Sequence, residues 1–188
     1  MKKIVITLFL LLTLGCSTHN KIEGIHKSDY AKPIKAVTLE NFHKVDAKIY
    51  RSAQPGREEF KALFKYGIRY TLNLRQFHDD TDELKGIAIE EYHIPINTSK
   101  MSYNQLVEAV SYLVHRDKKT LVHCLHGSDR TGTVIAGYRI AVQGWSKEKA
   151  IDEFVNGGFG YHSFWFSNLP QLLNNIDIEK FKQDVYAK

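Results

Sequence analysis

Residues 120–132 read TLVHCLHGSDRTG, in which a short apolar run leads into a polar loop with two glycines. The run at 120–123 has the length and composition of a buried strand, and a helix is predicted from Thr131 to Val142. A strand, a loop and a helix in succession form the repeating unit of α/β folds. The stretch therefore predicts such a unit, with Cys124 and Arg130 together in its loop.

Further strands and helices alternate along the chain on both sides of this unit. Strands are predicted at 45–50, 68–74 and 91–96, and helices at 57–66, 83–89, 102–115, 146–156, 169–175 and 178–186. This alternation favours a largely parallel sheet that is covered on both faces. We therefore expect an α/β fold, a single domain with a mostly parallel central sheet flanked by helices. Ligands of such sheets bind beyond the carboxyl ends of the strands, where the quoted loop lies.

The composition is that of a globular protein. The chain has 188 residues, of which 43% are hydrophobic and 25% charged, and its net charge is +5. This length suits one buried core. Lysines and arginines are spread along the sequence with no run of four or more, so we expect no nucleic-acid partner. A modest positive charge is compatible with any anionic ligand and does not indicate which one binds.

The N-terminus, MKKIVITLFLLLTLGCST, has the pattern of an export signal. Two lysines precede an apolar run that is too short to span a bilayer and that ends at Gly15 and Cys16. The segment resembles a bacterial lipoprotein signal, although Thr13 stands where an aliphatic residue is usual. We expect a lipoprotein signal peptide at 1–15, a lipid on Cys16 and a flexible tether at 16–36. The mature protein would be exported and anchored to the bacterial membrane, facing the periplasm; a plain secretory signal is the alternative.

Cys124 is then a lone thiol, because the sequence holds only two cysteines. No intramolecular disulfide is expected, and an unpaired thiol in an oxidising compartment calls for a function. The surrounding loop is suited to a phosphate group. Gly127 and Gly132 allow the backbone to wrap closely around an anion, and the following helix adds its positive end. Arg130 offers a planar fork to two phosphoryl oxygens, and the same positive field favours a nucleophilic thiolate.

Residues 123–132, HCLHGSDRTG, match the pattern HCxxGxxRTG, and here the sequence resembles the cysteine-dependent tyrosine and dual-specificity phosphatases. IYRSAQP at 49–55, IRYTLNLR at 68–75 and GGFGYH at 157–162 are similar to stretches of bacterial exported dual-specificity-like phosphatases. They are also similar to stretches of the atypical plant and fungal phosphatases that act on inositol pyrophosphates. The resemblance covers roughly residues 39–178 and implies a dual-specificity phosphatase-like fold, with a phosphatase domain at 37–188.

The resemblance also implies roles for single residues of the loop. Cys124 would be the nucleophile, Arg130 would clamp the phosphate, and Thr131 would donate a hydrogen bond to the sulfur and help the phosphocysteine to hydrolyse. The phosphate-binding amide cradle would consist of Leu125, His126, Gly127, Ser128 and Asp129.

The proton donor for the leaving group is not evident. Many members of this superfamily place an aspartate on a separate loop upstream of the cysteine, but that loop, residues 95–101, contains no carboxylate here. Asp129 is the preferred candidate, as in lipid phosphatases of the myotubularin type, because a bound dianion favours its protonated form. It could instead bond the loop amides. Asp79 and Asp80 are the alternative acids.

Several other side chains have smaller expected roles. His123 is expected to hold the loop through hydrogen bonds, and His126 either lies in solvent or assists the thiol. Arg75 either reaches the substrate or forms a structural salt bridge. Arg51 and Ser52 are interpreted as structural. The nine histidines show no paired metal spacing, so we expect no metal and no other cofactor.

The sequence thus predicts a metal-independent phosphatase that hydrolyses phosphate monoesters through a phosphocysteine intermediate. Its phosphorylated substrate is either a protein, as for tyrosine and dual-specificity phosphatases, or an inositol phosphate or phosphoinositide. The membrane is the other expected partner, through the lipid anchor. A phosphate-binding module with weak or no catalysis is the alternative, because residues 95–101 lack a carboxylate. A rhodanese-type sulfur transferase ranks last, since the arginine-threonine-glycine ending is atypical of it.

Overall fold

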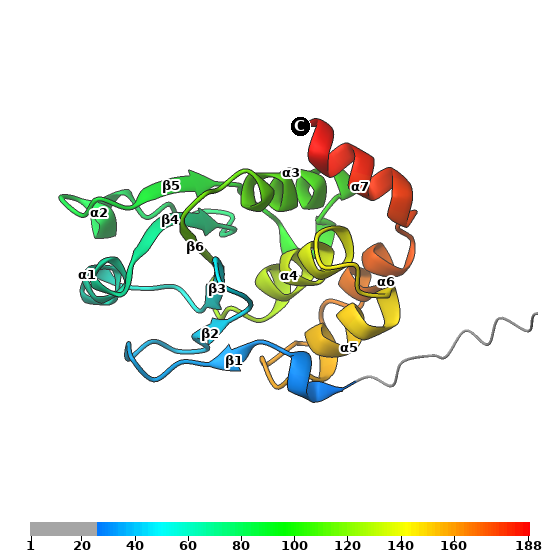
Figure 1. Cartoon of the computed structure of the whole chain (residues 1–188), viewed down its shortest axis with the longest axis horizontal. Coiled ribbons are helices and arrows are strands. Elements are labelled where there is room, and N and C mark those ends of the chain that lie inside the picture. The colour runs from blue at the N-terminus through cyan, green and yellow to red at the C-terminus, as the bar shows by residue number, and fades with distance from the viewer. Residues whose placement is uncertain (1–25) are drawn as a thin grey trace, which may run out of the picture.

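The structure, a computed structural model, describes residues 26–188. The predicted signal peptide and Cys16 lie outside the described residues. Within residues 26–188, no helix is both long and apolar enough to cross a lipid bilayer. A central sheet with helices on both sides makes up this part of the chain (Figure 1).

The sheet has six strands in the order β1-β2-β3-β6-β4-β5. Strands β3, β6, β4 and β5 are parallel to one another, and β1 and β2 add an antiparallel edge. The expected mostly parallel sheet is therefore confirmed. Because β6 lies inside the parallel part, the loop after it leaves the middle of the carboxyl edge. The bounds are Lys32–Pro33 for β1, His43–Lys44 for β2, Ile49–Ser52 for β3, Ile68–Asn73 for β4, Glu90–His93 for β5 and Lys119–His123 for β6.

Two groups of helices cover the two faces (Figure 1). One group is α1 (Arg57–Tyr66) and α2 (Thr81–Leu84); the other is α3 (Tyr103–Val114), α4 (Asp129–Ala141), α5 (Lys147–Asn156), α6 (Asn168–Asn174) and α7 (Ile178–Ala187). Two short 3₁₀ helices are η1 (Lys27–Asp29) and η2 (Thr98–Lys100). Successive residues of a strand point to opposite faces. Accordingly, Leu121 of β6 packs with Phe60 and Leu63 of α1, whereas Val122 belongs to the larger core under α3 to α7.

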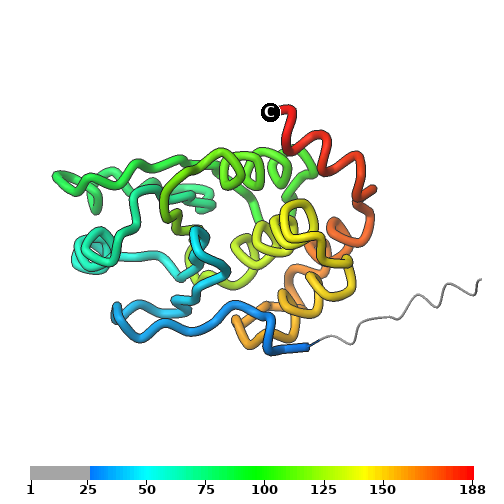
Figure 2. Tube along the Cα trace, in the orientation of Figure 1, coloured from blue at the N-terminus to red at the C-terminus, as the bar shows by residue number. Residues whose placement is uncertain are grey.

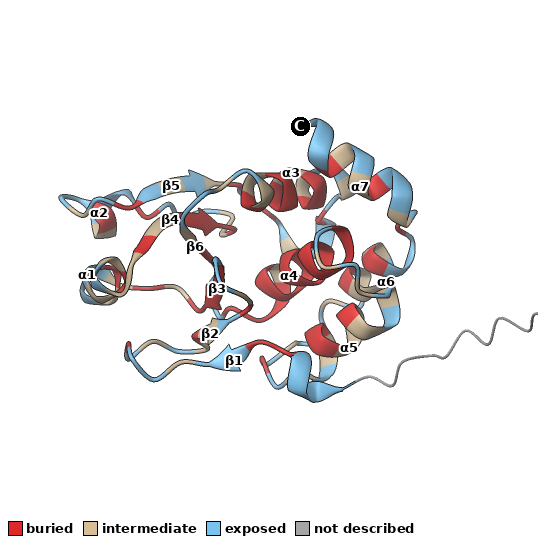
Figure 3. Ribbon diagram, in the orientation of Figure 1, coloured by how far each residue is buried: buried red, intermediate tan, exposed pale blue. Residues whose placement is uncertain are grey.

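Helix α4 is enclosed by α3, α5, α6 and α7 (Figure 2). All of its residues except Arg130 are buried (Figure 3). A helix that packs on all sides needs no polar face, which accounts for its small and apolar sequence. Arg130 lies in the first turn, because α4 begins at Asp129 rather than at the predicted Thr131. The predicted phosphate clamp is thus the one residue of α4 that is not buried.

The folded part begins earlier than the sequence predicts. The expected flexible tether extends to residue 36, but Tyr30 and Ala31 are only 5% and 6% exposed. The Tyr30 hydroxyl donates a hydrogen bond to Asp152, and the Ala31 N–H donates one to Glu153 Oε1 at 2.7 Å. Figure 2 shows this segment beside α5. The prediction is wrong for these residues because their partners lie 122 residues later, where local polarity gives no hint of them.

Local signals set the other boundaries. Helix α1 has the predicted bounds and ends at Gly67, whose φ of +105° is left-handed. The predicted capping box of α3 is confirmed, since the Gln105 N–H donates to Ser102 Oγ at 3.2 Å. The helix predicted at 83–89 is wrong in extent, because α2 covers only Thr81–Leu84 and Gly86, at φ +77°, stops it from continuing.

Candidate active site

Cys124 directly follows β6, at the carboxyl edge of the sheet. Its side chain is 1% exposed and forms no disulfide within residues 26–188. The next residue, Leu125, is 44% exposed, so the chain rises to the surface within one residue. The loop then returns to begin α4 at Asp129. The thiol therefore lies at the base of a short loop whose far side is the N-terminus of a helix.

Three carbonyl groups of the loop are held from outside it. The Gln54 N–H donates to the Leu125 carbonyl at 3.0 Å, and Asn41 Nδ2 donates to that of His126 at 3.0 Å. Arg51 Nη2 donates to the carbonyl of Gly127 at 2.6 Å. In a trans peptide the C=O and the following N–H point in opposite directions. The N–H groups of residues 126, 127 and 128 are therefore turned away from these donors, into the loop, as an amide cradle requires.

Close approach explains both glycines of the motif. Gly127 has φ +70°, and a Cβ there would lie 2.4 Å from the Ser52 carbonyl oxygen. At Gly132 a Cβ would lie 2.3 Å from the ring of Phe154. The first glycine lets the loop rest on the end of β3, and the second lets α4 rest against α5. The close contacts at these two glycines are made with Ser52 and Phe154, so the predicted close approach to an anion stays a prediction.

One nitrogen of the Arg130 guanidinium forms hydrogen bonds within the protein, and one edge of the group does not. Its Nη1 donates to the carbonyls of Leu74 and Ile96 at 3.3 and 3.2 Å. Its Nε is buried and has no hydrogen-bond partner among residues 26–188. The edge formed by Nε and Nη2 is the one that matches two oxygens of a phosphoryl group. The sheet thus fixes the guanidinium while leaving that edge for a ligand.

The Thr131 hydroxyl is also buried without a hydrogen-bond partner in the described part of the chain. The predicted bond from this hydroxyl to the Cys124 sulfur is therefore not formed. An unpaired buried hydroxyl is costly. The Thr131 hydroxyl, directly after Arg130, is therefore a hydrogen-bond donor that no group of the described residues accepts.

Asp129 contacts a residue of the segment after α5. Its Oδ1 accepts the backbone N–H of His162 at 2.9 Å, and its Oδ2 lies 2.8 Å from Nδ1 of the same histidine. The Asp129 side chain is 9% exposed and that of His162 is 43% exposed. Sequence reasoning quoted His162 only within the GGFGYH resemblance and gave it no role. The two residues are 33 positions apart, and no local pattern connects them.

His123 is fixed from behind the loop. Its Nε2 lies 2.7 Å from Asp80 Oδ2, and both side chains are fully buried. Gln54 Nε2 donates to the other oxygen, Oδ1, at 2.7 Å. The expected loop-holding role of His123 agrees with these contacts. Asp80 has both oxygens bonded within the protein, which is the arrangement of a support for His123 rather than of an exposed acid.

Arg51 contacts the loop from β3, in addition to its bond to Gly127. Its side chain is fully buried, and its guanidinium lies 3.8 Å above the centre of the Phe159 ring. Burial lowers the pKa of Arg51 to about 10, while the charges of Glu153 and of a Cys124 thiolate favour the protonated form. The sequence indicates a structural role for Arg51, and the structure places it as a buried cation against the loop that follows β6.

The sequence profile of the tyrosine phosphatase family matches residues 36–184. The chain belongs to this family. It is 30% identical over 122 residues to the dual specificity protein phosphatase TpbA of Pseudomonas aeruginosa, covering 64% of this chain and 56% of TpbA. It is 27% identical over 157 residues to the inositol diphosphatase DSP5 of Arabidopsis thaliana, covering 78% of this chain and 74% of DSP5. The match thus spans only about half the length of TpbA.

Solved structures of family members share the fold. The crystal structure of P. aeruginosa TpbA superposes with a TM-score of 0.74 at 24% identity, over 85% of this chain and 98% of TpbA. The core catalytic domain of the PP-IP phosphatase SIW14 from Saccharomyces cerevisiae, in complex with citrate, gives a TM-score of 0.68 at 25% identity. It covers 79% of this chain and 92% of that domain. The expected dual-specificity phosphatase-like fold is confirmed.

Two residues predicted near the site, Arg75 and Asp79, form hydrogen bonds within the protein. Arg75 donates from Nη1 to Gln54 Oε1 at 3.2 Å, and the salt bridges among residues 26–188 do not include it, so the predicted ion pair is absent. Asp79 accepts the N–H of Thr81 at 3.0 Å, just before α2. Hydrogen bonds from Thr81 hold the pKa of Asp79 below its usual range. An exposed carboxyl that stays ionised is poorly suited to donate a proton.

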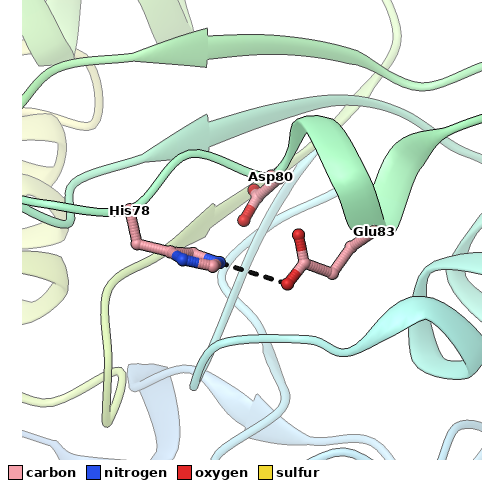
Figure 4. A group of neighbouring side chains, drawn as sticks. All are labelled: His78, Asp80 and Glu83. Carbon is pink, nitrogen blue, oxygen red and sulfur yellow. Dashed lines mark hydrogen bonds and ion pairs between the residues drawn. The ribbon is translucent and has the colours of Figure 1, made fainter.

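A group of metal-ligand type lies behind the loop. His78, Asp80 and Glu83 each offer one donor atom, and these atoms lie within 4.8 Å of one another (Figure 4). His78 Nε2 contacts Glu83 Oε1 at 3.1 Å. Asp80 also bonds His123 and Gln54, and Glu83 Oε2 is buried without a hydrogen-bond partner among residues 26–188.

Proposed function

We propose that the chain is a metal-independent phosphatase that hydrolyses phosphate monoesters through a phosphocysteine intermediate. The observation that supports it best is one arrangement at the carboxyl edge of the sheet. Cys124 directly follows β6, three loop amides are turned away from the donors that hold their carbonyl groups, and Arg130 keeps its Nε without a partner among residues 26–188, all next to the start of α4. Such a set of donors at a helix N-terminus suits a tetrahedral dianion.

The two chemical steps follow from these positions. The Cys124 thiolate attacks phosphorus, the ester P–O bond breaks, and the loop amides and Arg130 stabilise the charge on the equatorial oxygens. Water then attacks the phosphocysteine and releases phosphate and the thiolate. The free hydroxyl of Thr131 can turn to donate to the sulfur as it leaves. A metal has no step in this sequence, because the protein supplies the positive charge.

The substrate is a phosphotyrosine or dual-specificity protein substrate, or an inositol phosphate or phosphoinositide. The names of the relatives support both classes, since TpbA is called a dual specificity protein phosphatase and DSP5 an inositol diphosphatase. A phosphate-binding module with weak catalysis is the second candidate. It is favoured by residues 95–101, where Asn97 only caps η2 by accepting the Ser99 N–H at 3.1 Å.

The test is hydrolysis of 4-nitrophenyl phosphate in the presence of EDTA. The wild-type protein should turn over, Cys124→Ser should have no detectable activity, and Arg130→Lys should lose about 10²–10³-fold, because a lysine cannot form the two parallel bonds. Thermal unfolding of each variant controls for misfolding. Absence of wild-type turnover together with phosphate binding would favour the binding module. Activity that survives in Cys124→Ser would exclude the phosphocysteine mechanism.

A second assay separates the substrate classes. A phosphotyrosine peptide, a phosphoserine peptide, inositol hexakisphosphate and phosphoinositide vesicles are compared by kcat/KM under one buffer condition. Preference for the peptides would exclude the inositol class, and preference for the inositol phosphates would exclude the protein class. Cys124→Ser serves as the blank for each substrate.

We also propose that the protein is exported and anchored to the membrane through a lipid on Cys16. The pattern of residues 1–16 supports this. Cys16→Ala should move the protein from the membrane fraction to the soluble fraction and abolish incorporation of labelled palmitate. Unchanged labelling of the variant would contradict the anchor.

A further inference from the structure

We infer that His162 is the proton donor to the leaving group, and that Asp129 orients it. The inference rests on the proposed phosphatase function. It assigns a catalytic role to a residue outside the loop motif, and it changes the role of Asp129 from the acid to the support of the acid.

The bonds of Asp129 give the first reason. The backbone N–H of His162 can only donate, so Oδ1 of Asp129 accepts it at 2.9 Å. The Oδ2 oxygen lies 2.8 Å from His162 Nδ1. A carboxylate that accepts two hydrogen bonds is stabilised in its ionised form. We therefore assign the proton between Oδ2 and Nδ1 to the histidine, a choice that heavy-atom positions leave to be inferred.

The second reason is the state of the other ring nitrogen. When Nδ1–H of a histidine is held by a carboxylate, Nε2 is the atom that exchanges protons with a substrate. His162 Nε2 has no hydrogen-bond partner among the described residues, and the side chain is 43% exposed. The ring is thus fixed at one nitrogen and open at the other, as a general acid requires.

The location of the ring is the third reason. An open hollow of about 450 Å³ is lined by His162 together with His126 and Ser128 of the phosphate-binding loop. The rings of His126 and His162 lie 5.6 Å apart, and a Cβ at Gly160 would lie 3.1 Å from Ser128 Oγ. The segment that contains His162 therefore packs directly against the loop that follows Cys124.

The charged and titratable groups around this ring come from several elements. Asp129 bonds it from the start of α4, and His126 faces it from the loop. Glu40 and His43 line the same hollow from the region of β2. Burial lowers the pKa of His43, which keeps that ring neutral. Asp129 is thus the anion in direct contact with the ring of His162.

His162 gives one proton in the first step and takes one back in the second. His162 starts as an imidazolium with its Nδ1–H on Asp129. As the Cys124 sulfur forms a bond to phosphorus and the ester P–O bond breaks, the Nε2 proton passes to the leaving oxygen, which departs as an alcohol. In the second step Nε2 takes a proton from the attacking water while the P–S bond breaks. The cycle returns the imidazolium and the thiolate, and it needs no carboxylate in residues 95–101.

The test compares two leaving groups. The 4-nitrophenolate group of 4-nitrophenyl phosphate leaves without being protonated. The glycerol oxygen of glycerol phosphate needs a proton as it departs. His162→Gln should lower kcat/KM for glycerol phosphate by about 10²–10⁴-fold and that for 4-nitrophenyl phosphate much less. His115→Gln at the end of α3 is the matched control and should leave both unchanged. Asp129→Asn should show the same selectivity with a smaller loss, since the ring remains but loses its anion.

Four outcomes would overturn the inference. Equal slowing of both substrates in His162→Gln would reduce the residue to a structural one, and so would a pH profile of kcat that keeps its alkaline limb in this variant. Selective loss in Asp129→Asn alone would return the acid role to Asp129. A wild-type protein that hydrolyses neither ester would remove the proposed function as well. If the wild type is active and Cys124→Ser is not, the function stands whatever His162→Gln shows.

Discussion

Gly127→Ala is the substitution for which the structure gives the sharpest expectation. The added Cβ would lie 2.4 Å from the Ser52 carbonyl oxygen and 2.7 Å from the Ala53 nitrogen. Both are backbone atoms of the β3 end, so no side chain can swing aside. An ordinary contact needs 3.4 Å, so the loop must move by about 1 Å. The left-handed φ of +70° adds strain that an alanine does not relieve.

Two costs add in this variant. An L-residue in the left-handed region costs about 1–2 kcal/mol, and overpacking costs about 1–3 kcal/mol more. A total of about 2–5 kcal/mol lowers Tm by roughly 4–20 °C for a domain of this size. A displacement of about 1 Å in the loop that binds phosphate should also lower kcat/KM by about 10²-fold.

Gly144→Ala is the matched control. Gly144 lies between α4 and α5 at φ +68°, and a Cβ there has no neighbour within 4 Å. This variant has the dihedral strain without the collision, so it should lose about 1–2 kcal/mol of unfolding free energy and keep its activity. Thermal unfolding and 4-nitrophenyl phosphate kinetics of both variants give the comparison. If Gly127→Ala loses no more stability than the control and keeps wild-type kcat/KM, the close packing of the loop on β3 is refuted.

Two further substitutions test one buried and one half-buried carboxyl of the fold. Glu153→Gln removes the charge opposite Arg139, whose Nε and Nη2 lie 2.7 Å from the carboxylate, so it should cost about 3–5 kcal/mol in denaturant unfolding. An unchanged denaturant midpoint would mean that the Arg139–Glu153 pair adds nothing to the free energy of unfolding. Burial raises the pKa of Glu91, so this carboxyl stabilises the fold below its unfolded pKa, and that stability is lost as pH rises through the folded pKa. Glu91→Gln keeps an oxygen to accept the Asn73 amide and should gain stability over the wild type as pH rises from about 4 to neutrality. A difference in unfolding free energy between Glu91→Gln and the wild type that stays constant with pH would contradict this expectation.

Parts of the fold that depend on adjacent residues were predictable from the sequence. Helix α1 has its predicted bounds because its apolar stripe and its terminal Gly67 are both local signals. The β6–loop–α4 unit was predictable for the same reason. The antiparallel edge of β1 and β2 was not, since strands of two residues have no periodicity to detect. They exist because β2 pairs with β3 and β1 with β2, and β3 is in turn paired with β6 of the central sheet.

The candidate site divides in the same way. Cys124 and Arg130 were predictable because one stretch of ten residues holds the nucleophile, the glycines and the arginine. The supports of the loop were not. Asp80 bonds His123 from 43 residues upstream, and His162 bonds Asp129 from 33 residues downstream. A carboxylate in a sequence has no visible partner, so neither its charge state nor its role can be deduced before the fold is known.

Arg51, which the sequence indicates as structural, supports the loop through two contacts. Its hydrogen bond holds the Gly127 carbonyl outward, and because the peptide is planar it also turns the Ser128 N–H inward. The same guanidinium rests on Phe159, whose carbonyl accepts a bond from Asn41, and Asn41 in turn holds the His126 carbonyl. The residues that aim the amides of the loop are thus tied to the segment that contains His162. A displacement of Arg51 would disturb the amides of the loop and the segment of His162 together, although Arg51 itself is buried away from solvent.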